Sequence, residues 1–85
     1  MAAPLKAGTQ AEYQRARIRA LATLARTYPG DFAPLYASEQ AKEQQPLDVA
    51  AKARARQRAR AHLSRTHDTV YRALLAEELA KEATR

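Results

Sequence analysis

The stretch "RARIRALATLART" (residues 15–27) returns 39 residues later as "RARQRARAHLSRT" (residues 54–66). Aligned without a gap, residues 15–43 and 54–82 are identical at 15 of 29 positions. Chance would give about three matches for such a composition, so the similarity is a true repeat. The chain is therefore an internal duplication, and we expect its fold to consist of two similar units.

The composition favours helices. The chain has 85 residues, enough for one small domain, and its hydrophobic fraction is 46%. Alanine supplies 21 of those 39 hydrophobic residues, and Ala, Glu, Lys, Leu and Arg together supply 51 of the 85 residues. With two valines, one isoleucine and no alternating run, strands have no support. We predict an all-α protein.

Start and stop signals recur at the same spacing. Thr9 and Asp48, which are 39 residues apart, both suit an N-cap, and Thr9 has a capping-box partner in Glu12. The sequence "YPGD" (residues 28–31) ends the first helix, and Asp31 can cap the next one. We predict helices at about residues 10–27, 31–43, 47–66 and 69–83, with a linker at 44–46 and a turn at 67–68.

The domain organisation follows from these limits. We expect a flexible tail over residues 1–8 and a single helical domain over residues 9–85, made of repeat 1 (residues 9–43) and repeat 2 (residues 48–82). Each repeat is predicted to be a helical hairpin in which a basic helix precedes a more acidic one. Two tandem hairpins most simply form a small four-helix arrangement with internal pseudo-twofold symmetry.

The two basic helices differ on the face that would form the core. The first copy has an apolar stripe of Ile18, Leu21, Ala25 and Tyr28. The same positions in the second copy are Gln57, Arg60, Ser64 and His67. Core candidates in the second copy remain mainly at its ends, namely Val49, Ala53 and Leu63. The first copy is therefore expected to pack, and the second copy to contact a partner.

The charge indicates an acidic partner. The net charge is +6 and the isoelectric point about 10.2, which is typical of proteins that contact nucleic acid. The predicted phosphate-binding residues are Arg54, Arg58, Arg60 and Arg65, assisted by Arg15, Arg19 and Arg26. We expect backbone-dominated binding with little or modest base specificity, since the sequence contains no asparagine and Gln57 is the only candidate adenine reader among these arginines. DNA is the more favoured partner and RNA the alternative.

A second set of arginines is expected to pair internally. Glu39 and Glu78 occupy equivalent positions among apolar residues of the two acidic helices. A carboxylate there favours a bidentate arginine from the neighbouring basic helix, and Arg17 and Arg56 are the predicted partners.

Other interpretations stay open. The protein could be a small adaptor that docks on an acidic protein surface or associates with itself. It could also be a structural protein whose charges are neutralised between its own helices, or one whose arginine stripe is simply a solvated face.

Several classes of site have no support. There is no cysteine, His62 and His67 share no face with a carboxylate at ligand spacing, and two glycines cannot form a phosphate loop. We expect no enzyme activity, cofactor, metal or small-molecule substrate. The N-terminus lacks a secretory signal and no stretch is apolar enough to span a membrane, so we expect a cytoplasmic protein without membrane contact.

The repeated pattern "LxRTYPxDFxxLYAxExAKE" and "LxRTHxxxYxxLLAEELAKE" resembles short Arg/Ala-rich helical proteins of high-GC actinobacteria and their phages. The resemblance covers both predicted hairpins and implies an accessory protein of such a bacterium or phage. It carries over no functional residues.

Overall fold

A computed structural model of the chain describes residues 10–43 and 47–84. These residues form four helices and no strand: α1 (Gln10–Thr27), α2 (Pro29–Lys42), α3 (Val49–Thr66) and α4 (Asp68–Ala83). The predicted all-α, four-helix class is confirmed. The predicted tail at residues 1–8, the Thr9 cap and the linker at residues 44–46 lie outside the described residues.

The helix ends follow local rules. The Asp48 carboxylate caps α3 by accepting a hydrogen bond from the backbone N–H of Ala51 at 2.8 Å. Helix α2 begins at Pro29, two residues before the predicted start, because proline suits the first helical position. As a result Pro34 lies in the second turn of α2, where its missing N–H leaves the carbonyl of Gly30 without its usual helical partner.

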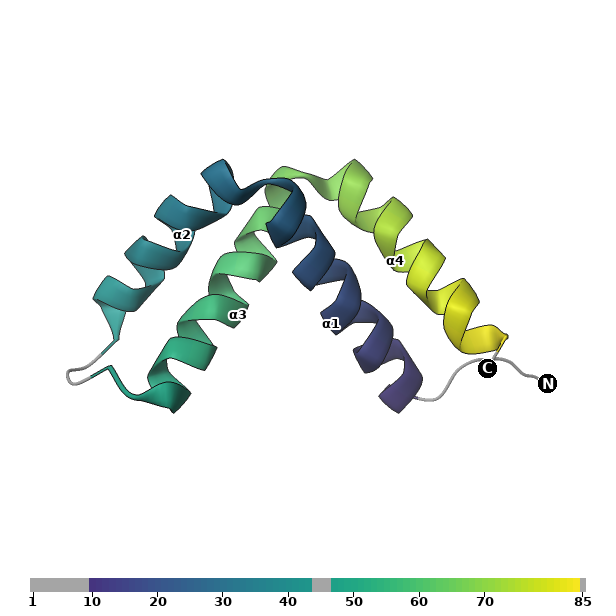
Figure 1. The fold of residues 1–85 in the computed structure, drawn as a ribbon, viewed down its shortest axis with the longest axis horizontal. Coiled ribbons are helices and arrows are strands. Elements are labelled where there is room, and N and C mark those ends of the chain that lie inside the picture. Colours follow the sequence, from purple (N-terminus) through teal and green to yellow (C-terminus); the bar gives the residue numbers. More distant parts are fainter. Residues whose placement is uncertain (1–9, 44–46, 85) are drawn as a thin grey trace.

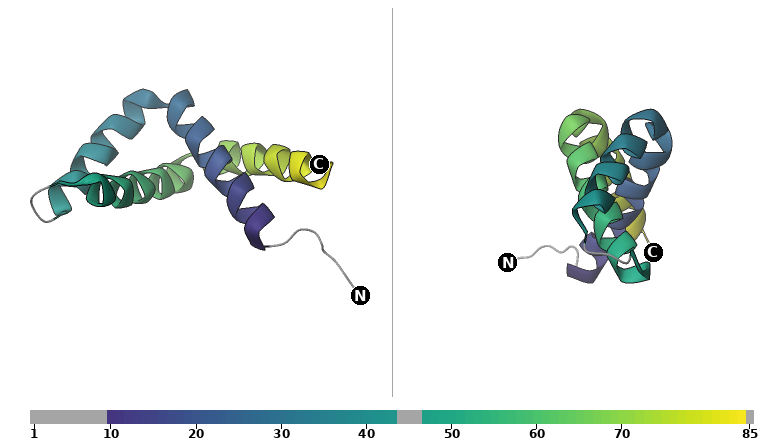
Figure 2. Two further views of the ribbon diagram at one scale, coloured as in Figure 1. Left: turned by 60° about the horizontal axis from the view of Figure 1, so that its bottom comes forward. Right: turned by 90° about the vertical axis from the view of Figure 1, so that its left-hand side faces the viewer.

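The molecule has the shape of a V with two arms (Figure 1). One arm is α2 packed along α3, and the other is α1 packed along α4. Each repeat therefore spans both arms, as the further views also show (Figure 2). The closely packed pairs thus join the two repeats, whereas the sequence suggested that the two helices of one repeat pack together.

The short connections explain this exchange of partners. A single residue, Tyr28, separates α1 from α2, and His67 alone separates α3 from α4. An antiparallel helical hairpin needs a loop of about two to five residues. The chain therefore changes direction at Tyr28 and at His67, but the two helices that each residue connects do not pack side by side. Each helix then finds its packing surface on the other repeat.

Alanine stripes line the contact within each arm. Ala16 and Ala20 on α1, and Ala55 and Ala59 on α3, have no exposed surface. Ala51 continues the stripe on α3. Small side chains at a helix–helix contact bring the two axes close together. That close approach brings the charged side chains on either side of the stripe within reach of the partner helix.

The larger core side chains gather where the two arms meet. Leu24, Ala25 and Leu63 form the buried cluster, and Leu24 and Leu63 occupy equivalent positions in the two repeats. The partly buried residues around the cluster are Tyr28, Phe32, Leu35, Val70, Tyr71 and Leu74.

The predicted core is only partly right. Leu21, Ala25 and Leu63 are buried as expected. Ile18 and Val49 are 53% and 85% exposed, so their assignment to the core is wrong. Both residues lie away from the alanine stripes through which the helices of each arm pack.

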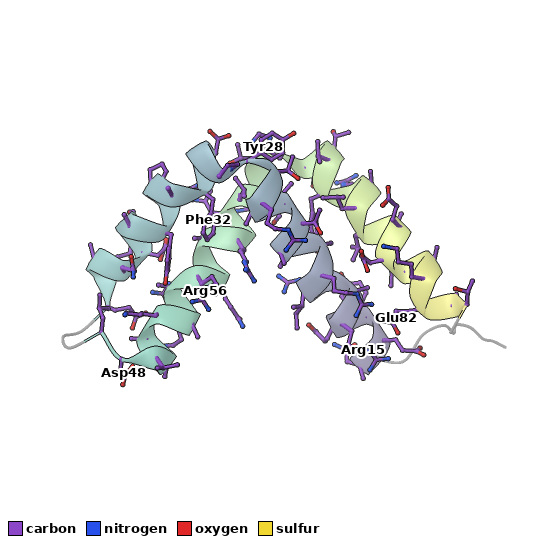
Figure 3. The ribbon with its side chains drawn as sticks, viewed as in Figure 1. Arg15, Tyr28, Phe32, Asp48, Arg56 and Glu82 are labelled. Carbon is purple, nitrogen blue, oxygen red and sulfur yellow. The ribbon has the colours of Figure 1, made fainter. Side chains whose placement is uncertain are left out.

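An aromatic pair closes the corner between the arms. The rings of Tyr28 and His67, again equivalent residues, stack with centroids 3.7 Å apart and an interplanar angle of 11°. Nε2 of His67 also lies 2.8 Å from the Asp31 carboxylate, which ties the α3–α4 turn to the start of α2. Tyr28 is labelled at the apex of the V in Figure 3.

The open V makes the molecule elongated. Its principal dimensions are 48 × 23 × 19 Å and its radius of gyration is 14.8 Å, compared with about 12 Å for a compact chain of this length. Within residues 10–43 and 47–84, no helix combines the length and the apolar character that crossing a membrane requires.

Candidate functional site

The α1–α4 arm is held by an arginine–glutamate network. Nε of Arg19 donates to Oε1 of Glu78 at 2.7 Å, and Nη2 of Arg15 donates to Oε1 of Glu82 at 3.0 Å. Arg19 also pairs with Glu82. The side chain of Glu82 is only 4% exposed, so its charge is sequestered between the helices. Arg15 and Glu82 lie together toward the far end of this arm (Figure 3).

The α2–α3 arm contains the same network, formed by the equivalent residues of the two repeats. Nε of Arg58 donates to Oε1 of Glu39 at 2.7 Å, and Nη2 of Arg54 donates to Oε1 of Glu43 at 2.9 Å. Arg58 also pairs with Glu43. The correspondence shows that the duplication preserved both sides of each interface.

These contacts set the charge states of the carboxylates. Hydrogen bonds from Arg58 and Lys42 lower the pKa of Glu39, and hydrogen bonds from Arg58 and Arg54 lower that of Glu43. In the other arm, Arg19 and Lys81 lower the pKa of Glu78 in the same way. The ion pairs therefore hold these glutamates in the ionised form.

The two predicted glutamates do form ion pairs, but their partners are not the predicted arginines. Glu39 and Glu78 are bound by Arg58 and Arg19, whereas Arg17 and Arg56 contact neither glutamate. The latter pair lies on the opposite side of the alanine stripes, which corrects the predicted partners.

Aromatic rings occupy that opposite side. The guanidinium of Arg56 lies 5.8 Å from the centroid of the Tyr36 ring, at the distance of a cation–π contact. Burial raises the pKa of the Tyr71 hydroxyl, and the adjacent Arg17 opposes part of that rise. Each alanine stripe is thus flanked by an ion-pair side and an arginine–aromatic side.

The predicted phosphate-binding residues divide into two groups. Four of the seven are held in the networks of the arms: Arg15, Arg19, Arg54 and Arg58. Arg26, Arg60 and Arg65 form no ion pair among the described residues. Arg26 only donates to Oγ1 of its neighbour Thr23, at 3.1 Å.

Helices α1 and α3 therefore carry cations that no acid neutralises. In the part of the chain that the structure describes, six lysine or arginine side chains form no ion pair. They are Arg17 and Arg26 on α1, and Lys52, Arg56, Arg60 and Arg65 on α3. The four cations on α3 include two, Lys52 and Arg56, that were not among the predicted phosphate ligands.

A cleft of about 400 Å³ lies between α1 and α3. Helix α1 contributes Gln14, Arg17, Ile18 and Leu21, and helix α3 contributes Gln57 and Arg60 together with Arg58 and Ala61. The sequence did not predict this cleft. The signal that could have indicated it is the replacement of an apolar pair in the first repeat by Gln57 and Arg60 in the second.

Arg60 is the least satisfied cation of the cleft. Its Nε is buried and has no hydrogen-bond partner among the described residues. Burial lowers the pKa of Arg60, and the nearby charges of Arg56 and Arg26 lower it further. A buried donor without a partner typically costs about 1 to 3 kcal/mol. The Arg60 residue as a whole is only partly buried, so an anion in the cleft would offset the repulsion from Arg56 and Arg26.

The described residues include no group of three or more His, Asp or Glu side chains that could hold a metal ion. His67 is occupied by Tyr28 and Asp31 at the apex. Comparison of the chain with known protein families, curated proteins and solved structures finds no match.

Proposed function

We propose that the protein binds nucleic acid through the phosphate backbone, with DNA as the preferred form. The observation that carries this proposal is the set of six cations on α1 and α3 that form no ion pair among the described residues, while the glutamates of the arms are already occupied. Phosphate groups are the commonest polyanionic partner for such a surface.

The contact residues differ from those expected at first. Arg26, Arg60 and Arg65 remain direct contacts, and Arg17, Lys52 and Arg56 join them. The arginines of the ion-pair networks contribute only to the long-range potential, because moving to a phosphate would break their pairs with glutamate. The contact stays with the basic helices, and no helix is positioned as a dedicated reader of base edges.

The proposal is tested with fluorescence anisotropy on a random-sequence DNA duplex and its RNA counterpart between 50 and 300 mM salt. Each phosphate contact contributes a slope of about −0.9 to the plot of log K against log salt, so four to six contacts give a slope of about −4 to −5. A protein that binds neither duplex at 50 mM salt would contradict the proposal and leave an acidic protein surface as the partner for these cations.

A pair of triple variants separates a specific surface from net charge alone. Replacing Arg26, Arg60 and Arg65 with alanine removes three unpaired cations from the basic helices. The control replaces Lys42, Arg72 and Lys81 with alanine, which removes the same charge from α2 and α4. We expect the first variant to lose at least tenfold in DNA affinity and the control less than threefold. Equal losses would show that no particular surface is used.

A further inference from the structure

The two walls of the cleft between α1 and α3 have opposite chemistry. Ile18 and Leu21 of α1 supply an apolar wall, and Ile18 is 53% exposed. The equivalent residues of α3, Gln57 and Arg60, supply a polar and cationic wall. Because equivalent positions of the two repeats lie on the two sides of the cleft, divergence between the copies made it amphipathic.

Two of the guanidinium groups that line the cleft have no acidic partner among the described residues. The buried Nε of Arg60 has no acceptor there, and Arg17 on α1 lies beside the Tyr71 hydroxyl and pairs with no carboxylate. Arg58 also lines the cleft but is held by Glu39 and Glu43. An anionic group entering the cleft therefore has the guanidinium groups of Arg17 and Arg60 available to it. Gln14 and Gln57 can add neutral hydrogen bonds.

A ligand for this cleft needs an anionic part and a flat or apolar part. The volume of about 400 Å³ is at the small end of the range for ligand sites. Arginine binds phosphate with paired N–H donors, and an apolar wall accepts the face of a base or the carbon side of a sugar. We propose that the cleft binds one nucleotide unit, with its phosphate on Arg60 and Arg17 and its base or sugar against Ile18 and Leu21.

This inference deepens the proposed function, since it assigns one nucleotide of a bound strand to a defined site. A free nucleotide presents the same chemistry, so the two sources have to be separated by experiment. The rest of the cationic surface would contact backbone phosphates elsewhere along the strand. The cleft alone distinguishes a nucleotide from a bare phosphate.

The first test uses calorimetric titration of the full chain with adenosine monophosphate, adenosine and inorganic phosphate at constant ionic strength. We expect adenosine monophosphate to bind at least fivefold more tightly than either fragment, because only it uses both walls. Binding no tighter than that of inorganic phosphate would overturn the proposal.

Two variants locate the site. Arg60→Leu installs the residue that the first repeat has at this position, Leu21, and is expected to fold, which a circular dichroism melt checks. Arg72→Leu removes the same charge from an exposed position of α4 that does not line the cleft. We expect Arg60→Leu to lose at least tenfold in nucleotide affinity and Arg72→Leu less than twofold. Equal losses would overturn the site.

The outcomes distinguish this inference from the proposed function. Tight duplex binding without preferential nucleotide binding would leave the proposed function intact and refute the cleft. Nucleotide binding without duplex binding would support the cleft and refute the proposed function. Titration with a single-stranded decamer shows which form of nucleotide occupies the cleft. A decamer that displaces adenosine monophosphate supports a nucleotide of a bound strand as the occupant. A decamer that cannot displace it supports the cleft as a site for a free nucleotide.

Discussion

At the scale of single residues, one substitution between the repeats has large consequences. Leu21 is buried, and its equivalent Arg60 presents a buried Nε without an acceptor. The leucine at this position therefore stabilises the first repeat, whereas the arginine at the equivalent position lowers the stability of the second. Since natural proteins retain such a cost mainly at functional sites, Arg60 is the residue whose replacement tells most about this molecule.

The first prediction concerns stability. We expect Arg60→Leu to raise the free energy of unfolding by on the order of 1 kcal/mol, because it removes an unsatisfied donor and the repulsion from Arg56 and Arg26. Urea denaturation followed by circular dichroism measures this change. The reciprocal variant Leu21→Arg is the matched control and is expected to destabilise the fold. A loss of stability in Arg60→Leu would show that Arg60 has an internal partner.

At the scale of helices, the arms combine close packing with ion pairs. Alanine stripes bring α1 against α4 and α3 against α2, and the flanking glutamates bind arginines of the opposite repeat. Neither feature is sufficient alone, because alanine buries little apolar surface and isolated exposed ion pairs contribute little. Each arm therefore depends on both.

The second prediction tests the alanine stripes. Ala16→Leu and Ala55→Leu place a larger side chain at equivalent, fully buried positions, so each is expected to cost about 1 to 3 kcal/mol in free energy of unfolding. Ala37→Leu, at an exposed position of α2, is the control and should change stability by less than about 0.5 kcal/mol. Urea denaturation of the three variants checks the difference, and similar values for all three would refute close packing.

The third prediction concerns pH. The folded protein holds the pKa of Glu39, Glu43 and Glu78 below that of the unfolded chain, which is about 4.3 for glutamate. Their contribution is complete above the unfolded pKa and is lost as the pH falls through the lowered, folded pKa. We expect the Tm to be steady from pH 7 to 5 and to fall steeply below about 4.5.

A glutamine variant verifies the source of this pH dependence. The double variant Glu39→Gln and Glu78→Gln should have a lower Tm at pH 7 and a flatter decline in acid than the natural protein. Glu77→Gln, at the exposed position next to Glu78, should keep the natural profile. An unchanged decline in the double variant would mean that other groups control acid unfolding.

Much of this local structure could be predicted from the sequence. Helix limits agree to within about two residues. Asp48 caps α3 as predicted, whereas the predicted Asp31 cap is wrong, because α2 begins at Pro29 and Asp31 lies inside its first turn. The pairing of arginines with Glu39 and Glu78 was foreseen, but the choice of arginines was not. Arg17 and Arg19 lie on different sides of α1, and only the packing of α4 decides which side receives the carboxylate.

At the scale of the whole molecule, the two arms meet at the apex. Among the described residues, Leu24 and Leu63 are the largest fully buried side chains, and they lie together in the cluster where the arms meet. The stacked rings of Tyr28 and His67 close the same region. The relative placement of the arms therefore depends on this small cluster. The sequence could not predict the V. The predicted connections, residues 28–30 and 67–68, are long enough for helical hairpins, whereas the single-residue connections of the structure are not.

The fourth prediction tests the apex. Leu24→Ala and Leu63→Ala are each expected to cost about 2 to 5 kcal/mol in free energy of unfolding, and by similar amounts since the positions are equivalent. Val49→Ala, at a position 85% exposed, is the control and should be close to neutral. Urea denaturation measures all three. A small effect of both leucine variants would show that the arms are stable independently of the apex.

The exchange of helices between repeats has a consequence for stoichiometry. A basic helix of either copy finds its acidic counterpart only in the other copy. A polypeptide carrying a single copy would have no such counterpart and would have to recruit a second identical polypeptide to complete both arms. Covalent fusion thus replaces what would otherwise be a symmetric dimer. It also allows the two halves to differ, as Ile18 and Leu21 differ from Gln57 and Arg60, which two identical polypeptides could not.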